Sequence, residues 1–244
     1  MALFDMIRTL FIMIWTILVT IFFGVIVIVI SFFSKKGNIC HKYAGIWARS
    51  ILFVSRIKVT VKGLSNIGSI KSCIYMPNHQ SNFDIPVLLG HLNVQFRWLA
   101  KVELFKIPIF GYAMKRAGYI SIDRSNRKSA FISLKRAAKI IREGVSVLIF
   151  PEGTRNKESN IGQFKKGGFV LAVDSGVPIV PVIIHGTRAI MPTKKLLIRP
   201  KDVILEIKKP IETRDYTRKT KEDLMEKVRQ TISDSFERGK RYNP

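Results

Sequence analysis

Two apolar runs flank a polar segment that reads Asn78-His79-Gln80-Ser81-Asn82-Phe83-Asp84. The run before it, residues 72–76, has the length and composition of a buried strand. The run after it contains Pro86 near its start, a position that proline tolerates in the first turn of a helix. A strand, a polar loop and a helix in this order predict an α/β unit whose loop can carry a functional site.

His79 and Asp84 are candidates within this loop for a base and the acid that orients it. On one continuous helix, side chains five positions apart lie roughly 140° apart, so a helix alone would not pair them. If the helix begins near residues 82–85, Asp84 lies in its first turn and can accept from one ring nitrogen of His79, while the other nitrogen faces outward. That is two thirds of a catalytic triad, without a nucleophile. The alternative is a helix cap at residues 81–84 beside a bystander histidine.

The composition predicts an anionic partner and one good-sized domain. The chain has 244 residues, with 41 Lys and Arg against 17 Asp and Glu, for a formal net charge of +24. So basic a chain suits membrane lipid, nucleic acid or a phosphorylated substrate. Cys40 and Cys73 lack metal-ligand spacing, and the four histidines do not cluster with them. We therefore expect reduced, structural cysteines and no metal site.

The N-terminal segment predicts a membrane anchor. Residues 9–34 carry no charge and are mostly Ile, Val, Phe and Leu. At about 1.5 Å per residue, such a helix can cross a hydrocarbon core of roughly 30 Å, and it is longer than the apolar core of a signal peptide. Residues 43–54 predict a second, amphipathic helix, beside the first or at the interface. The sequence leaves open a single span and a two-helix anchor in one leaflet. Four cations follow the apolar run and predict a cytoplasmic domain: Lys35, Lys36, Lys42 and Arg49.

Strands and helices are predicted to alternate after this anchor, which we assign to residues 1–56. The predicted strands are residues 57–61, 72–76, 96–100, 119–122, 145–150, 177–184 and 203–207, and the predicted helices are residues 85–92, 127–142, 167–175 and 224–236. The two prolines of strand 177–184 favour its start or a sheet edge. Residues 107–112 predict a packed loop or short helix, or else part of an acyl-lined or membrane-facing wall. Residues 57–244 therefore predict a single α/β domain with a central mostly parallel or mixed sheet flanked by helices.

Two further polar loops follow predicted strands, and loops of this kind gather at one edge of an α/β sheet. One is Asp123-Arg124, and the other is Glu152-Gly153-Thr154-Arg155. Gly153 would let backbone amides approach an anion, and Arg155 would clamp that anion with two hydrogen bonds. The plainer alternative is a turn after a strand. Arg124 and Lys101 are either further anion ligands or members of surface ion pairs.

A histidine base without a protein nucleophile suggests that the base activates a hydroxyl of the substrate. The basic side chains suggest that this substrate carries phosphate, and the anchor suggests that it lives in a membrane. Together they point to acyl or phosphoryl transfer onto a membrane-resident phosphorylated alcohol. The sequence has no Gly-x-Ser-x-Gly elbow and no Walker-type phosphate loop. A basic, membrane-tethered binding module without catalysis is the alternative, although no nucleic-acid motif is present and we expect no nucleic-acid partner.

Four blocks of the chain resemble, in order, the signature blocks of the glycerolipid acyltransferases. The first is the His-x4-Asp spacing of residues 78–84, and the others are residues 118–124, 150–155 and 177–182. The chain length and the N-terminal apolar segment point, within that family, to the bacterial 1-acyl-sn-glycerol-3-phosphate acyltransferases. The resemblance implies acylation of lysophosphatidic acid to phosphatidic acid at an inner membrane, with the catalytic domain on the cytoplasmic side. Glycerol-3-phosphate or another lysophospholipid is the alternative acceptor.

The resemblance also implies roles for the matched residues. His79 would be the general base that deprotonates the acceptor hydroxyl for attack on an acyl thioester, with Asp84 orienting its ring. The glycerol phosphate would be held by Arg124, Glu152, Gly153, Thr154 and Arg155, with Lys101 as a further ligand outside the four blocks. An amide of the Gly153 turn is the candidate oxyanion donor. No metal or bound cofactor is implied. Acyl-coenzyme A or acyl-carrier protein would be the co-substrate, and anionic membrane lipids would meet the basic surface.

Overall fold

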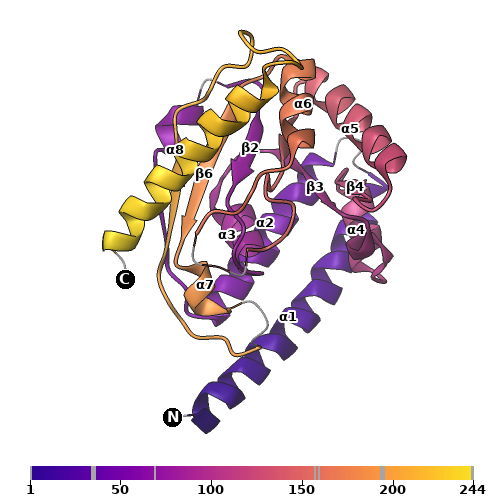
Figure 1. Ribbon diagram of the computed structural model, residues 1–244. Helices are drawn as coiled ribbons and strands as arrows, with labels where there is room; N and C mark the ends of the chain where they lie inside the picture. The colour runs from indigo at the N-terminus through magenta and orange to yellow at the C-terminus, as the bar shows by residue number, and fades with distance from the viewer. Residues whose placement is uncertain are drawn as a thin grey trace.

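A seven-stranded sheet forms the centre of the molecule (Figure 1). The computed structural model describes residues 2–33, 37–68, 70–156, 158, 160–192 and 196–242. The strand order is β1-β7-β6-β2-β5-β3-β4, and neighbours are parallel except for the antiparallel pair β6 and β7. The predicted mixed sheet is therefore confirmed. The strands are β1 (Val59–Lys62), β2 (Ile74–Pro77), β3 (Phe96–Lys101), β4 (Ile120–Ile122), β5 (Ser146–Leu148), β6 (Ile179–His185) and β7 (Val203–Ile207).

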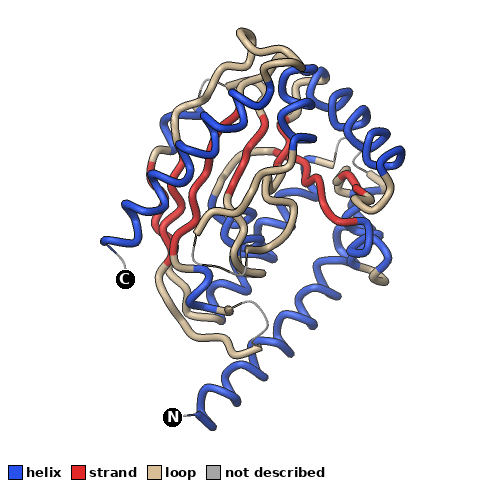
Figure 2. The backbone as a smooth tube through the Cα atoms, in the orientation of Figure 1, coloured by secondary structure: helices blue, strands red, loops and turns tan. Residues whose placement is uncertain are grey.

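The prediction of an edge position or a strand start for the two prolines is wrong for Pro181. It lies inside β6, which is a central strand between β2 and β7 (Figure 2). The antiparallel pairing with β7 begins only at Val182, one residue later, so the missing amide of Pro181 costs no hydrogen bond in that ladder. Its carbonyl still accepts from the amide of Lys208 at 3.0 Å.

Two hydrophobic cores cover the two faces of the sheet, because successive side chains of a strand point to opposite faces. On β2, Tyr75 joins one core, while Ile74 and Met76 join the other. The first core contains residues of α1 (Ala2–Ser31), α2 (Asn38–Val54), α3 (Asp84–His91) and α4 (Phe110–Arg116). The second contains residues of α5 (Arg127–Arg142), α6 (Lys166–Ser175) and α8 (Lys221–Tyr242), which lie together across one face in Figure 1.

Local signals account for the start and the end of α5. The side chain of Asn126 caps the helix by accepting from the amide of Ser129 at 3.0 Å. After the helix, Gly144 adopts a φ of 83°, a left-handed conformation that glycine reaches without a steric cost and that ends the helix. The predicted boundaries of this helix are therefore confirmed.

Several short elements complete the chain. The apolar residues 107–112 lead into α4, which begins at Phe110. The prediction of a short helix in this segment is therefore confirmed for residues 110–112. Two 3-10 helices, η1 (Leu64–Ile67) and η2 (Val102–Lys106), follow β1 and β3. A one-turn helix, α7 (Thr187–Ile190), follows β6 directly and was not predicted.

The first helix, α1, lies along the domain and keeps an apolar outer face. Among the described residues it is the one helix that is long and apolar enough to cross a membrane, by length and composition. Only a narrow stripe of the helix is buried against the domain, and this stripe includes Ile12, Val19 and Val27. Its exposed apolar side chains include Phe4, Ile7, Leu10, Phe11, Ile14, Ile17, Leu18, Ile21, Phe22, Val25 and Val29. This exposed surface indicates that the protein associates with a membrane.

The second helix, α2, connects α1 to the domain. Trp47 donates from its indole to Thr20 at 3.0 Å, and Trp15 donates from its indole to Ser50 at 3.0 Å. The opposite side of α2 packs on α3 beneath the sheet. The predicted second helix beside the first is therefore confirmed. Of the cations that predicted the orientation, Lys35 and Lys36 lie outside the described residues.

Candidate active site

The loop between β2 and α3 brings His79 and Asp84 together. Nδ1 of His79 lies 2.7 Å from Oδ2 of Asp84, and Asp84 lies in the first turn of α3, as the sequence predicted. The carboxylate is fully buried, while the imidazole keeps about 15% of its surface exposed. Because the carboxylate accepts at Nδ1, that nitrogen carries the proton and Nε2 keeps its lone pair. In the described part of the chain, Nε2 has no hydrogen-bond partner.

Four donors surround the Asp84 carboxylate. Oδ2 accepts from the amides of Gln80 at 2.7 Å and Ser81 at 2.9 Å in addition to the imidazole. Oδ1 accepts from the hydroxyl of Thr187 at 2.5 Å. The bond from the Ser81 amide is the one that the capping alternative predicts, but α3 begins at Asp84 itself and its N-cap, Phe83, makes no side-chain capping bond. One carboxylate therefore contacts both the imidazole of His79 and the backbone that precedes α3.

Long-range contacts hold this loop against the neighbouring strand. Asn78 is fully buried, and its side chain donates to the carbonyl of Ile184 at 3.0 Å and accepts from the amide of Ile184 at 2.7 Å. These bonds hold the end of β2 against the end of β6. Helix α7 follows β6 directly, and its first residue, Thr187, contacts Asp84. The carboxyl ends of these parallel strands meet at one edge, as the sequence predicted.

The loop after β5 lies beneath His79. The ring of Phe150 stacks on the imidazole with ring centroids 3.8 Å apart and an interplanar angle of 14°. Glu152 is buried, and its two oxygens accept from the amides of His79 at 2.8 Å and Gly162 at 2.9 Å. Burial raises the pKa of Glu152 above its ordinary value, while these two hydrogen bonds act against the rise. Glu152 thus joins the loop after β5 to the backbone of His79.

Gly153 separates two cations. It adopts a φ of 78°, and a Cβ at this position would lie 3.4 Å from Cγ of Lys165 and 3.5 Å from Nη1 of Arg124. Its own amide donates to the carbonyl of Phe150 at 3.1 Å, so the predicted oxyanion donor would be another amide of this turn. Gly153 therefore brings Arg124, from the loop after β4, close to Lys165 at the start of α6.

The remaining predicted residues lie on the same edge of the sheet. Lys101 is the last residue of β3. Its Nζ lies 3.1 Å from Oε1 of Glu103, and both side chains are exposed. The structure therefore shows the surface ion pair that was one of the two alternatives for Lys101. Thr154 is exposed after the Gly153 turn. Arg155 is partly exposed and forms no ion pair with any described residue. The next amide, of Asn156, donates to the carbonyl of His79 at 2.8 Å.

Sequence reasoning missed three contributors to this site: Thr187, Phe150 and Lys165. Phe150 is the first residue of the block 150–155 and Lys165 comes ten positions after the block ends, yet apolar and basic side chains are common near any strand and carry no separate signal. Thr187 comes 103 positions after Asp84, and no local pattern marks it. A short polar stretch directly after strand 177–184 was the available hint.

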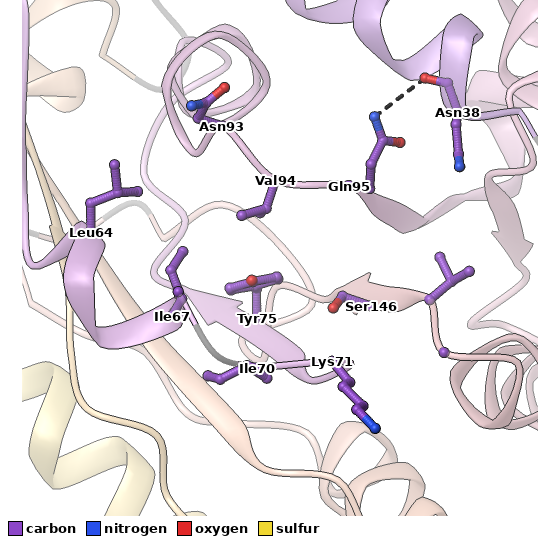
Figure 3. A pocket seen from close by; sticks show the side chains of 13 residues that line it. Asn38, Leu64, Ile67, Ile70, Lys71, Tyr75, Asn93, Val94, Gln95 and Ser146 are labelled. Carbon is purple, nitrogen blue, oxygen red and sulfur yellow. Dashed lines mark hydrogen bonds between the residues drawn. The ribbon is translucent and has the colours of Figure 1, made fainter.

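A separate hollow of about 440 Å³ lies at the opposite, amino-terminal edge of the sheet. Figure 3 shows side chains of Tyr75, Asn93, Gln95 and Ser146 around it, with the amide of Gln95 donating to the carbonyl of Asn38. The sheet separates this hollow from His79, so it forms no part of the site. Among the described residues, no group of three or more His, Cys, Asp or Glu side chains is arranged to hold a metal ion.

The geometry equips the site for proton abstraction beside an anion. A histidine with a free ring nitrogen lies at the carboxyl edge of the sheet, its tautomer is held by a buried carboxylate, and cations flank a neighbouring turn. In an α/β protein, this arrangement is suited to taking a proton from a hydroxyl group that lies beside an anion.

Comparison with known proteins assigns the family. The acyltransferase family model matches residues 58–185, and the chain belongs to this family. A chloroplastic 1-acyl-sn-glycerol-3-phosphate acyltransferase of Brassica napus is 38% identical over 185 residues, which are 75% of this chain and 53% of the relative. The 1-acyl-sn-glycerol-3-phosphate acyltransferase of Pseudomonas aeruginosa is 38% identical over 141 residues, 56% of this chain and 54% of the relative. The chain thus spans about half the length of these curated relatives.

A solved structure has the same fold over nearly the whole chain. It is the 1-acyl-sn-glycerophosphate (LPA) acyltransferase PlsC of Thermotoga maritima, which is 28% identical to this chain. The superposition has a TM-score of 0.84 and covers 98% of this chain and 97% of the other. The shared fold therefore includes the N-terminal helices as well as the residues that the family model matches.

Proposed function

We propose that this protein transfers a fatty acyl group from an acyl thioester to the sn-2 hydroxyl of 1-acyl-sn-glycerol-3-phosphate, giving phosphatidic acid for phospholipid synthesis. The observation that carries the proposal is the 2.7 Å contact between His79 and Asp84, which leaves Nε2 of the histidine free. The names of the relatives and of the structural neighbour support this acceptor.

In the proposed mechanism, Nε2 of His79 takes the proton of the acceptor hydroxyl as the oxygen attacks the thioester carbonyl. The new ester bond forms as the carbon–sulfur bond breaks, and the proton passes to the departing thiolate. Asp84 keeps Nδ1 protonated and stabilises the transient imidazolium. Phe150 beneath the ring limits its tilt. The reaction requires no metal and no bound cofactor, since acyl-coenzyme A or acyl-carrier protein enters as co-substrate.

The proposed phosphate site lies around the Gly153 turn. Arg124 and Lys165 both reach this turn, and Arg155 leaves it without an ion pair among the described residues. Arginine binds phosphate through two parallel hydrogen bonds, and lysine adds a point charge. We assign Glu152 to positioning, because both of its oxygens already accept from backbone amides. Lys101 and Thr154 stay predicted ligands at the rim of this site.

We infer that the domain lies on the cytoplasmic side of the inner membrane and that α1 enters one leaflet only. The hydroxyl of Thr9 accepts from the amide of Ile198 at 3.0 Å, and Arg116 donates to the carbonyl of Ser31 at 3.0 Å. Thr9 and Ser31, the two residues of α1 that make these hydrogen bonds, are about 33 Å apart along the helix, which is close to the thickness of a hydrocarbon core. A helix that crossed the bilayer would carry part of the domain across with it.

A panel of acceptors tests the proposed activity. The purified protein is given 1-acyl-sn-glycerol-3-phosphate, glycerol-3-phosphate and other lysophospholipids, each with both thioester donors, and the products are separated by thin-layer chromatography. We expect turnover of 1-acyl-sn-glycerol-3-phosphate. Turnover of another acceptor alone would reject the assigned substrate, and no turnover at all would favour the basic binding module without catalysis.

His79→Ala tests the base. We expect turnover to be abolished while the variant stays folded and membrane-bound, because the substitution removes the imidazole and leaves the buried Asp84 with its other donors. Circular dichroism and membrane flotation check the fold and the membrane association. Activity retained near the level of the unmodified protein would rule out the mechanism.

A further inference from the structure

The outer face of α5 is a stripe of cations and apolar side chains. The exposed residues of the helix, spaced three or four positions apart, are Lys128, Phe131, Ile132, Lys135, Arg136, Lys139 and Arg142. Phe131 is 46% exposed and Ile132 is 61% exposed, although they lie in the middle of a charged surface. The helix sequence contains no acidic residue. We call these seven residues the α5 stripe.

Nothing in the described part of the chain neutralises the α5 stripe. Lys128, Lys135, Arg136, Lys139 and Arg142 form no ion pair with a described residue; Lys135 instead lies 4.8 Å from the ring centroid of Phe131. Like charges three or four positions apart on a helix destabilise it. An acidic partner would therefore stabilise this surface, because it would pair with the cations and cover the two apolar side chains.

The α5 stripe lies beside a cavity. A cavity of about 460 Å³ lies between α5 and α6. Its apolar lining includes Leu134, Ala138, Val170 and Leu171. Cations at its rim come from the stripe and from Arg218, which also pairs with Asp174 at 2.7 Å. An apolar groove with a cationic rim is complementary to an amphipathic helix with acidic flanks.

The position of the stripe indicates that its partner comes from water and not from the bilayer. The exposed apolar face of α1 belongs to the helices on one side of the sheet, and α5 packs on the other side. Figure 1 shows α5 beside α6 and away from the N-terminal part of α1. At its N-terminus α5 follows Arg124, whose guanidinium lies beside the Gly153 turn. The N-terminal end of the α5 stripe is thus adjacent to the loop that we assign to phosphate binding.

We propose that the α5 stripe and the adjoining hollow dock an acidic, helical carrier protein that presents the acyl group as a thioester. This inference rests on the proposed acyl transfer and selects the protein-borne donor for this surface. The cations raise the rate of encounter with an acidic carrier, and Phe131 and Ile132 become buried on docking. Coenzyme A, which lacks a helical surface, needs none of these contacts.

A comparison of donors tests the docking surface. Full-length protein in lipid micelles carries Lys135→Glu, Arg136→Glu and Lys139→Glu together, and acyl-carrier protein and coenzyme A deliver the same acyl chain. We expect kcat/KM to fall at least about tenfold with the carrier-borne donor and to change less than about twofold with acyl-coenzyme A. A matched control carries Lys219→Glu, Lys227→Glu and Arg238→Glu, exposed cations near or on α8, and should retain both activities.

Each other outcome overturns the docking proposal. An unchanged rate with the carrier, an equal loss with both donors, or an equal loss in the control would show that the α5 stripe has no specific role. The docking proposal would also be overturned if the unmodified protein did not turn over the carrier-borne donor. Lower co-sedimentation of the α5 variant with vesicles of anionic lipid would assign the stripe to lipid headgroups. The proposed acyl transfer fails separately, if the unmodified protein uses neither donor.

Discussion

Asp84 shows how single residues determine the site. Its carboxylate is fully buried, and burial of a charge is costly unless hydrogen bonds compensate it. Three of its four donors come from residues 79–81, and the fourth is Thr187, from a helix of one turn. The orientation of His79 therefore depends on a residue distant in sequence.

Thr187→Val should slow turnover without weakening acceptor binding. The isosteric substitution removes the donor to Oδ1 of Asp84, at a cost of about 1–3 kcal/mol for a buried group that loses its partner. We expect kcat to fall about tenfold, with the acceptor KM unchanged within about twofold, in steady-state assays. Thr187→Ser keeps the hydroxyl and should restore most of the rate. A serine variant as slow as the valine variant would show that packing, and not the hydrogen bond, matters here.

Arg155→Ala should chiefly weaken acceptor binding. The side chain has no ion-pair partner among the described residues and follows the Gly153 turn, so it is available for phosphate. Loss of a charge-assisted hydrogen bond of about 1.5–3 kcal/mol corresponds to a rise of about tenfold or more in the acceptor KM. Both KM values are measured at saturating co-substrate. A rise confined to the donor KM would contradict the phosphate assignment.

Helix α2 shows how one element connects two parts of the fold. Its outer side packs on α1, and its buried His41 reaches the sheet side. Nδ1 of His41 lies 3.0 Å from the hydroxyl of Tyr119, and Nε2 lies 3.1 Å from the carbonyl of Val94. Burial, and then the charge of Arg97, lower the pKa of His41 to about 4. The folded protein thus holds this imidazole neutral.

A neutral buried histidine should make stability depend on pH. The unfolded chain takes up a proton near pH 6.5, whereas the folded chain does so only near pH 4. The contribution of His41 is therefore complete above pH 6.5 and is lost progressively as the pH falls toward 4, by up to about 3 kcal/mol. Thermal unfolding is measured in detergent at pH 7.5 and at pH 4.5. The Tm of the His41→Gln variant should fall less between these two pH values than the Tm of the unmodified protein. Equal decreases in both proteins would contradict this assignment.

The helices of the molecule as a whole are divided between the two faces of the sheet, and the helix with the exposed apolar surface, α1, belongs to one of them. Helices α1 and α2 lie on one side of the sheet, and α5, α6 and α8 lie on the other (Figures 1 and 2). His79 and Asp84, the proposed catalytic pair, lie at the carboxyl edge of the sheet between them. Under the proposed function, a lipid acceptor would enter from the α1 side, and the proposed carrier-borne donor would approach from the α5 side.

The proposed position of α1 in one leaflet predicts the location of the N-terminus. An epitope tag before residue 1 should be digested by protease from the same side of sealed membrane vesicles as a tag after residue 244. Both vesicle orientations are tested, with detergent-opened vesicles as the digestion control. Digestion of the two tags from opposite sides would show that α1 crosses the membrane.

The sequence by itself determined the order of the elements and the local chemistry. Hydrophobic periodicity marks strands and helices because it reflects which face is buried, and the strand–helix alternation implies the α/β class. The pairing of His79 with Asp84 was one of the two arrangements that the sequence offered, because Pro86 in the first turn places the helix start near residues 82–85 and restricts both residues locally. The loops after strands were expected at one edge for the same reason, since parallel strands end together.

Only the tertiary structure decided which distant residues meet. The central position of β6 despite Pro181, the bond from Thr187 to Asp84, and the place of Lys165 beside Arg124 depend on strand order and on helix packing. The attachment of α1 at both ends depends on them too. Such contacts join segments far apart in the chain and leave no periodic pattern in either one. They follow from how the two faces of the sheet are covered, which is a property of the whole folded chain.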